Sequence, residues 1–404
     1  MDTMTRRRFL KASGVAGAGA LLAGSGAFGV HELFAAAQSR PLPAGTGVLV
    51  VVTLYGGNDG LSMLVPIDDP AYHDARGDLA LQASETIPLS EGLALNGVMK
   101  GLAAQWRAGH LAIVRGVSYP DPQQSHFVSM DIWQTASPGS PSGTGWVGRW
   151  LDVEERASGH DPIRAVSLGP TMPPFMAGAT TSAAAVAPGP IRLPAGVLGR
   201  AYTALNVSRP DQPQAGVALS GADLAAVASQ LGPTLAGVTP SDASTNDAGA
   251  LGPQLDLVAR CIHAGVPTRV YGVDLGGFDT HADEKATQTA LLGKLDSGLG
   301  TFLASVATAA HPVTVLVYSE FGRRTHANAS GGTDHGTSAP VLVAGTRVRG
   351  GFYGDEPSLT HLIMGNLAVT TDFRDVYAGV LTGVLGADPE PVLGKSFSGL
   401  PLLA

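Results

Sequence analysis

Five apolar segments rich in Val, Leu and Ile constrain the fold of this 404-residue chain more than any other feature. They are Val48–Tyr55, Leu111–Val117, Arg269–Asp274, Val313–Ser319 and Pro340–Ala344. An unbroken apolar run, rather than an alternation of apolar and polar residues, is typical of a strand buried on both faces. We therefore expect these segments to form the central strands of a parallel sheet.

Two segments in the second half of the chain predict helices that pack against such a sheet. Gln254–Ala264 ends at Gly265, with Pro267 just beyond, as helices often do. Another segment has its apolar residues at helical spacing, namely Leu291, Leu295, Leu299, Phe302 and Val306. The helix–strand–helix–strand order predicts an α/β fold with a doubly wound, mostly parallel sheet sandwiched by helices.

Residues 167–250 differ in composition from the rest of the chain. This stretch is dense in Ala, Gly, Pro, Ser and Thr, with few charged residues and weak periodicity. We interpret it as an insertion or cap of loops and short helices within a domain that spans residues 38–404. The alternative is that this stretch is partly disordered.

Residues 1–37 have the three parts of a cleavable export signal. Arg6, Arg7 and Arg8 are followed by a Gly/Ala-rich apolar stretch and then by Ala35-Ala36-Ala37. Paired arginines and a glycine-rich apolar region are typical of the twin-arginine pathway, whereas a membrane anchor would be longer and poorer in glycine. We predict folded export through the twin-arginine translocon to the periplasm, cell surface or medium, with no permanent membrane anchor.

The net charge of the chain argues against a protein that binds nucleic acid, and its single cysteine excludes a protein stabilised by internal disulfides. The formal charge is −8, and removal of residues 1–37 would change it to −10, which disfavours a nucleic-acid partner. Cys261 cannot form an internal disulfide, because it is the only cysteine. It lies in an apolar helical pattern, so we interpret it as a core residue rather than a reactive thiol.

Polar residues follow the predicted strands at the points where the strands end. Asp59 follows the first strand and Ser125 the second, and the others follow the third and fourth: Asp279, His281, Glu320, Arg323, Asp334 and His335. In open parallel sheets, functional residues gather just beyond the carboxyl ends of the strands. We therefore expect these side chains to converge at one edge.

Close pairs of Asp and His are the donors that a zinc- or manganese-type ion accepts. Asp279 with His281 and Asp334 with His335 are two such pairs, and Asp59 lies at the end of a third predicted strand. Each pair alone has an ordinary alternative, since an Asp in a glycine turn often caps backbone amides and a surface His is often only solvated. Their coincidence favours a metal site.

Ser125 and Arg323 are the candidate catalytic residues. Ser125 precedes the helical pattern that begins at His126, so it is either a plain N-cap or a hydroxyl placed where backbone amides stabilise an anion. Arg323 or its neighbour Arg324 is either a solvated loop charge or a bidentate clamp for an oxyanion.

At these positions the chain resembles the bacterial domain of unknown function 1501 family. The resemblance rests on the arginine signal, the Gly-Gly-Asn-Asp-Gly turn, Ser125-His126-Phe127, Gly277-Phe278-Asp279-Thr280-His281, Ser319-Glu320-Phe321-Gly322-Arg323, Gly332-Thr333-Asp334-His335-Gly336 and Thr371-Asp372-Phe373-Arg374. That family is distantly similar to the alkaline phosphatase and sulfatase superfamily. The resemblance implies an alkaline-phosphatase-like fold, two metal ions and a Ser, Thr or modified Cys nucleophile.

Carried over to this sequence, the resemblance gives Asp59, Asp279, His281, Asp334 and His335 as metal ligands and Ser125 as nucleophile. The superfamily usually places three residues between the Asp and His that match Asp279 and His281, where this chain has one. The usual last metal histidine has no clear counterpart, since His361 is the only histidine after His335 and its context differs. His126 or Glu320 could take the missing place.

The sequence thus predicts an exported metal-dependent hydrolase of a phosphate or sulfate ester, with Ser125 attacking and Arg323 holding the oxyanion. The ion would be zinc, manganese, magnesium or calcium, and the ester itself is not identified. The alternative is a non-catalytic secreted binding protein with a degenerate site of the same kind.

Overall fold

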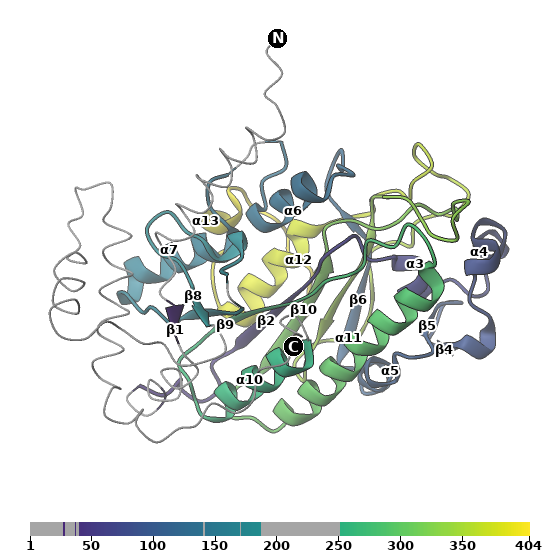
Figure 1. The fold of residues 1–404 in the computed structure, drawn as a ribbon. Helices are drawn as coiled ribbons and strands as arrows, with labels where there is room; N and C mark the ends of the chain where they lie inside the picture. Colours follow the sequence, from purple (N-terminus) through teal and green to yellow (C-terminus); the bar gives the residue numbers. More distant parts are fainter. Residues whose placement is uncertain (1–26, 29–36, 38–39, 140–141, 170, 187–250) are drawn as a thin grey trace, which may run out of the picture. The chain divides into compact units, whose positions relative to one another are not determined.

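The computed structural model of the protein describes residues 27–28, 37, 40–139, 142–169, 171–186 and 251–404 (Figure 1). The chain divides into two compact units, which are described separately. The large unit comprises Pro43–Ser142, Gly249–His263 and Arg269–Ala404. The small unit comprises the described residues within Met1–Leu42, Gly143–Ala248 and Ala264–Thr268.

The large unit is built on one sheet with the strand order β9-β2-β10-β11-β6-β12. Its strands are β2 (Val48–Leu54), β6 (Leu111–Ser118), β9 (Val270–Leu275), β10 (Val313–Ser319), β11 (Ala339–Ala344), β12 (Gly351–Tyr353) and β13 (Thr371–Asp372), the last paired with β6. β2 lies between β9 and β10, runs parallel to both, and is buried along its whole length. The predicted mostly parallel sheet is confirmed.

The direction of β11 corrects the prediction of a parallel strand at Pro340–Ala344. β11 runs antiparallel to both of its neighbours, β10 and β6. A parallel return to the adjacent position needs a crossover connection, usually a helix. Residues 320–338, which join β10 to β11, contain no helix, so the chain turns back beside the strand it has just left.

Helices cover both faces of this sheet, as predicted. α10 (Leu251–His263) and α11 (Glu284–Val306) lie on one face, and α6 (His126–Thr135) and α12 (Phe373–Val380) lie on the other (Figure 1). The predicted apolar face of α11 is buried throughout. Cys261 on α10 is buried as well, and burial raises its thiol pKa to about 12, which fits a core residue.

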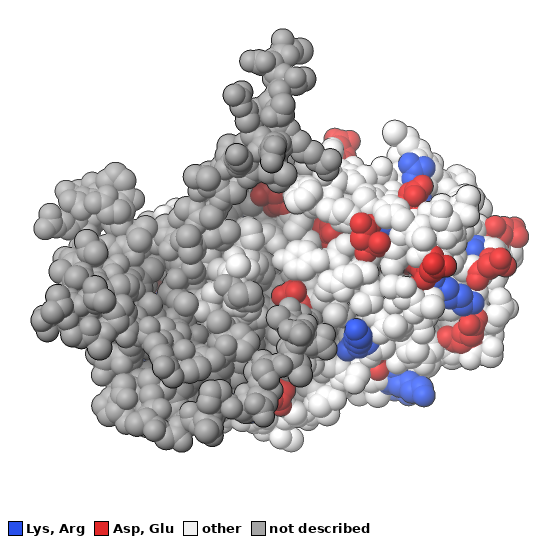
Figure 2. All heavy atoms as spheres, viewed as in Figure 1, with Lys and Arg blue, Asp and Glu red and all other residues white. Residues whose placement is uncertain are grey.

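The remaining elements of the large unit lie at one end of the sheet and at its margins. They are α3 (Gly60–Met63), α4 (Pro70–Arg76), α5 (Lys100–Arg107), α13 (Glu390–Leu393) and a small antiparallel sheet of β3 (Leu64–Val65), β5 (Ala94–Asn96) and β4 (Thr86–Pro88). On the face shown in Figure 2, acidic and basic side chains lie side by side over this end. The described residues on this face therefore present no extended area of one charge sign.

In the small unit, β7 (Ala165–Leu168) and β8 (Ala184–Val186) pair in parallel, and β1 (Ala27–Phe28) pairs with β8. Its helix α7 (Trp146–Ser158) is tied to a loop by Asp152, which accepts hydrogen bonds from the backbone amides of residues 179–181. The predicted insertion at 167–250 lies outside the described residues from 187 onward, as does most of the predicted signal at 1–37. No described helix is long and apolar enough to cross a membrane.

An aromatic cluster attaches α6 to the sheet. The ring of Trp133 stacks on Tyr318 of β10 at 5.0 Å between centroids and on Phe373 of α12 at 4.5 Å. The hydroxyl of Tyr377 donates a hydrogen bond to the carbonyl of Trp133 at 3.1 Å. These contacts fix the helix whose first turn begins with Ser125 and His126.

Replacing this indole should therefore destabilise the protein strongly. We expect Trp133→Ala to lower the free energy of unfolding by roughly 3–5 kcal/mol, because it opens a cavity between three elements. Phe127→Ala is the matched control on the same helix, since that ring is 82% exposed, and it should change stability by less than about 0.5 kcal/mol. Urea unfolding of the mature protein measures both, and equal losses would contradict this account of the packing.

Candidate functional site

Loops that follow the carboxyl ends of β6, β9 and β10 meet at one edge of the large unit's sheet. The loop after β9 carries Asp279 and His281, and the loop after β10 carries Glu320 and Arg323. The segment after β6 leads into α6 and His126, and the stretch before β11 carries His335. The parallel direction of β9, β2, β10 and β6 places these ends together, as expected for an open α/β sheet.

Four of these side chains form a cluster around one carboxylate oxygen. The Oδ1 atom of Asp279 lies 3.0 Å from Nε2 of His281, 3.2 Å from Nε2 of His335 and 3.4 Å from Nε2 of His126. The Nε2 atoms of His281 and His335 are 3.0 Å apart. We call His126, Asp279, His281 and His335 the histidine cluster.

Each imidazole of the histidine cluster has an oxygen acceptor on its other side. His126 Nδ1 lies 2.8 Å from Oε1 of Glu320, and His335 Nδ1 lies 2.8 Å from the carbonyl of Gln124. Nδ1 of His281 faces Asp334 at 3.5 Å. An acceptor at Nδ1 favours a proton there, so the lone pair of each Nε2 atom is directed at the centre of the cluster.

Glu320 is the most buried of these acceptors, at 2% exposure of its side chain. Its Oε1 atom accepts hydrogen bonds from the Gly56 amide at 2.9 Å and from His126. The hydrogen bond to Glu320 is the main reason that the pKa of His126 is raised. The Nε2 atom of His126 is buried without a hydrogen-bond partner among the described residues, which leaves its lone pair available to the cluster.

Arg323 holds the loops of the site together. Its buried guanidinium donates to the carbonyls of Gly57 at 2.7 Å, Thr333 at 2.9 Å and Phe278 at 3.0 Å, and also to the carbonyl of Gly56. The same group donates to Oδ1 of Asp279 at 2.7 Å. The predicted oxyanion clamp therefore differs from what is observed, because this guanidinium is committed to protein acceptors and its side chain is 0% exposed.

The charge of Asp279 depends on these contacts. Burial alone would raise its pKa, but the hydrogen bond from Arg323 and the contact with the imidazole of His335 lower the pKa to about 2. The carboxylate is thus ionised throughout the physiological range, even though half of its side chain surface is covered.

Two glycines allow the loops to approach one another so closely. A Cβ atom on Gly56, which has φ of +117°, would lie 2.5 Å from the amide nitrogen of Asp279. A Cβ atom on Gly332 would lie 2.3 Å from the carbonyl carbon of His281. Any side chain at either position would push the β9 loop away from its neighbours.

The other predicted residues are placed differently. Asp59 is fully buried as the N-cap of α3, and both of its carboxylate oxygens bind Arg76. Ser125 is exposed at the N-cap of α6, where its side chain makes no capping hydrogen bond. His361 is exposed and lies beside Ser358, apart from the histidine cluster.

Sequence reasoning left His126 and Glu320 as substitutes and missed Arg76 and Gln124. His126 could have been favoured over the other candidates, because it follows the strand-end segment directly and begins a helix. Gln124 contributes a backbone carbonyl, and Arg76 comes from α4, so neither has a signal in the local sequence.

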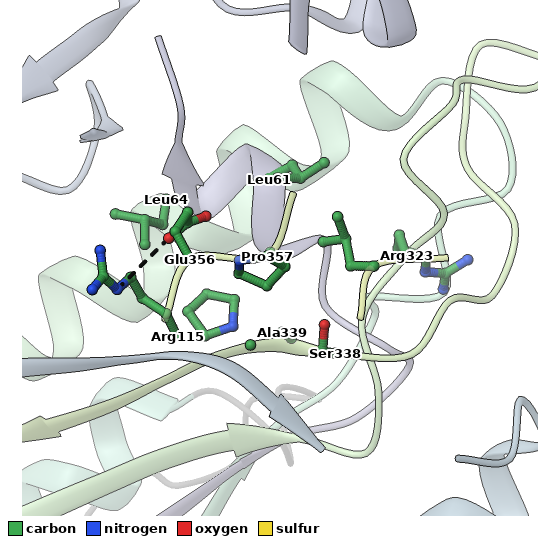
Figure 3. Close-up of a pocket in the computed structure, with 12 residues that line it drawn as sticks. Leu61, Leu64, Arg115, Arg323, Ser338, Ala339, Glu356 and Pro357 are labelled. Carbon is green, nitrogen blue, oxygen red and sulfur yellow. Dashed lines mark ion pairs between the residues drawn. The ribbon is translucent and has the colours of Figure 1, made fainter. Parts of the chain in front are cut away.

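A small pocket lies near the site but does not include its histidines (Figure 3). It is lined mainly by apolar groups such as Leu61, Leu64 and Pro357, with Arg115 and Glu356 at 3.8 Å from one another. Of the described residues that line the pocket, Arg323 alone also belongs to the site. The histidine cluster is therefore the better candidate for chemistry.

Two family models match the chain. Residues 241–391 match the family described as "Protein of unknown function (DUF1501)", which confirms the predicted resemblance for that part of the chain. Residues 3–23 match the TAT (twin-arginine translocation) pathway signal sequence, so the protein is one that is exported through this pathway. No curated protein matches the chain in sequence.

Solved structures similar to this chain include members of the predicted superfamily. A protein in the alkaline phosphatase superfamily from Vibrio parahaemolyticus is 11% identical, with 92% of this chain and 79% of that chain covered and a TM-score of 0.43. The phosphoglycerol transferase GacH from Streptococcus pyogenes is 9% identical, with 92% and 85% covered and a TM-score of 0.37. Alkaline phosphatase from the Antarctic bacterium TAB5 is 11% identical, with 76% and 95% covered and a TM-score of 0.37.

The bracing role of Arg323 can be tested by a substitution that keeps its charge. Arg323→Lys should lower the free energy of unfolding by at least about 2 kcal/mol, because an ammonium cannot reach acceptors on three loops and leaves buried carbonyls unpaired. Arg324→Lys, at the neighbouring half-buried position, should change stability by less than about 0.5 kcal/mol. Chemical unfolding of the two variants tests this expectation. An Arg323→Lys variant as stable as the wild type would contradict the bracing role.

Proposed function

We propose that this exported protein is a metal-dependent hydrolase of a phosphate or sulfate ester. The observation that carries the proposal is the histidine cluster, in which three Nε2 atoms and one ionised carboxylate face a common centre. Imidazole and carboxylate are the ligands of zinc- and manganese-type ions. Oriented Nδ1 atoms, each facing an acceptor, are the usual support of metal-binding histidines.

The donor set fits one divalent ion. His126, Asp279 and His335 each offer a ligand atom, all within 4.8 Å of one another, and the Nε2 atom of His281 lies beside them. Arg323 would hold the carboxylate of Asp279 in place for the ion, since it donates to Oδ1. Of the other predicted ligands, Asp334 would orient His281, and Asp59 is engaged by Arg76.

A bound ion would act as a Lewis acid and would neutralise charge that develops on the ester group. The residues of the chain would bind and orient that ion, and Arg323 and Glu320 would keep the loops and His126 in position. Gln124 would do the same for His335 through its carbonyl. In this proposal Arg323 is a positioning residue.

Ser125 is the proposed nucleophile. Its hydroxyl is exposed, makes no capping hydrogen bond, and stands next in sequence to His126. The first amides of α6 lie just beyond it, where a helix N-terminus favours an anionic group. Attack by Ser125 would form a bond from its oxygen to phosphorus or sulfur and break the bond to the ester oxygen, which leaves as the alcohol with the proton lost by the serine. Water would then cleave the serine ester, restoring the hydroxyl and releasing phosphate or sulfate.

Metal content provides the first test of the proposal. The mature protein, purified without chelator, should hold about one equivalent of zinc or manganese by elemental analysis. His335→Ala should weaken binding at least about tenfold in a chelator competition, since even residues that only orient a ligand contribute that much. His361→Ala, which removes an exposed histidine outside the cluster, should bind as the wild type does, and equal binding by both variants would contradict the assignment.

Activity provides the second test. Wild type, Ser125→Ala and His335→Ala are compared on aryl phosphate monoesters, phosphodiesters and sulfate esters with added zinc, manganese, magnesium or calcium. Ser125→Ala should lose hydrolysis while keeping its metal and nearly all of its stability, because an N-cap costs at most about 1 kcal/mol here. Unchanged hydrolysis by Ser125→Ala would refute the nucleophile. A wild type that is inert on every ester and holds no metal would favour the binding-protein alternative.

A further inference from the structure

Three charged side chains form a cluster beneath the site that the proposed reaction does not use. We call Asp59, Arg76 and Glu284 the buried charge cluster. The guanidinium of Arg76 donates to Asp59 with two nitrogens, at 2.6 and 2.7 Å, and lies 3.8 Å from Glu284. All three side chains are only 1% exposed.

The two carboxylates are held by their cation. Burial alone would raise the pKa of Asp59, but the charge and hydrogen bonds of Arg76 lower it. The pKa of Glu284 is raised, by burial first and by the charge of Asp59 second. A buried carboxylate without a cation is costly, so the ionised Asp59 needs a positive group beside it, and Arg76 supplies that group.

The oxygen atoms around this position would suit a hard divalent ion. Besides the two carboxylates, the hydroxyl of Ser62 hydrogen-bonds to Asp59. Carboxylate and hydroxyl oxygens are the preferred ligands of magnesium and manganese. Asp59 also stands at the strand end where the sequence predicts a metal ligand, which makes the presence of an arginine there significant.

We propose that Arg76 is a built-in cation that replaces a second metal ion at Asp59 and Glu284. The protein then carries one exchangeable ion, at the histidine cluster, and that part of the statement rests on the proposed function. The guanidinium is attached to α4 and cannot be lost to a chelator.

Arg76 also connects the buried charge cluster to the loop that bears Asp334 and His335. It donates to the carbonyl of Arg324 at 3.2 Å, and the hydroxyl of Thr333 donates to Glu284 at 2.6 Å. This loop is thus fastened to the cluster at two points, Arg324 and Thr333. A fixed cation keeps this attachment intact whether or not the histidine cluster holds its ion.

The test is to remove the guanidinium and supply a metal. Arg76→Ala should be destabilised in metal-free buffer, since it leaves buried carboxylates unpaired, and added Mn²⁺ should raise its melting temperature further than that of the wild type. Elemental analysis should find about one more equivalent of manganese in Arg76→Ala than in the wild type. Arg76→Lys keeps a positive charge and should gain none.

A double variant separates a new ion site from simple loss of packing. Asp59→Asn combined with Arg76→Met removes both charges, and it should fold without Mn²⁺ and bind no extra ion. The inference is overturned if Arg76→Ala gains no manganese, or if it stays unfolded at millimolar Mn²⁺ while the double variant folds. The measured quantity is the difference in manganese content between Arg76→Ala and the wild type. A wild type that holds no metal would therefore refute the proposed function and leave the inference about Arg76 to be decided by that difference.

Discussion

The hydrogen bonds of Arg323 are the interaction on which the rest of the site depends. One guanidinium joins the loop after β2, the loop after β9 and the stretch before β11 through their carbonyls, and it fixes Asp279 at the same time. A planar group with five N–H donors can do this, whereas an ammonium cannot. Without it, these loops would keep their backbone hydrogen bonds and the contacts with Arg76 and Glu284, but no side chain would join all three of them.

The elements of the fold were predictable because their signals are local. The unbroken apolar run of β2 and the helical spacing of the leucines on α11 each lie within one short segment. The direction of β11 was not predictable in this way, since Pro340–Ala344 has the composition of a central strand. Its antiparallel course depends on the absence of a helix in the connection before it, which is a property of the whole path from β10.

In the candidate site, too, some residues were predictable from local signals and others were not. The strand-end rule predicts that Asp279, His281 and His335 meet, because it needs only the strands and their order. It cannot predict that Asp59 is taken by Arg76, since 17 residues separate the two and α4 carries no motif. The sequence also cannot distinguish a side chain that binds an ion from one that orients another ligand, as the positions of Asp334 and Glu320 illustrate.

The assembly of the site from three separate strand ends bears on where the protein acquires an ion. His126, Asp279 and His335 lie up to 209 residues apart in the chain and come together only when the sheet is complete. A twin-arginine substrate completes its sheet before it crosses the membrane, so the site forms in the cytoplasm. If the histidine cluster holds a metal, the metal supply of the cytoplasm selects it, and the protein leaves the cytoplasm already loaded. The identity of that ion then reflects intracellular availability rather than the affinity ranking that would govern a site formed outside.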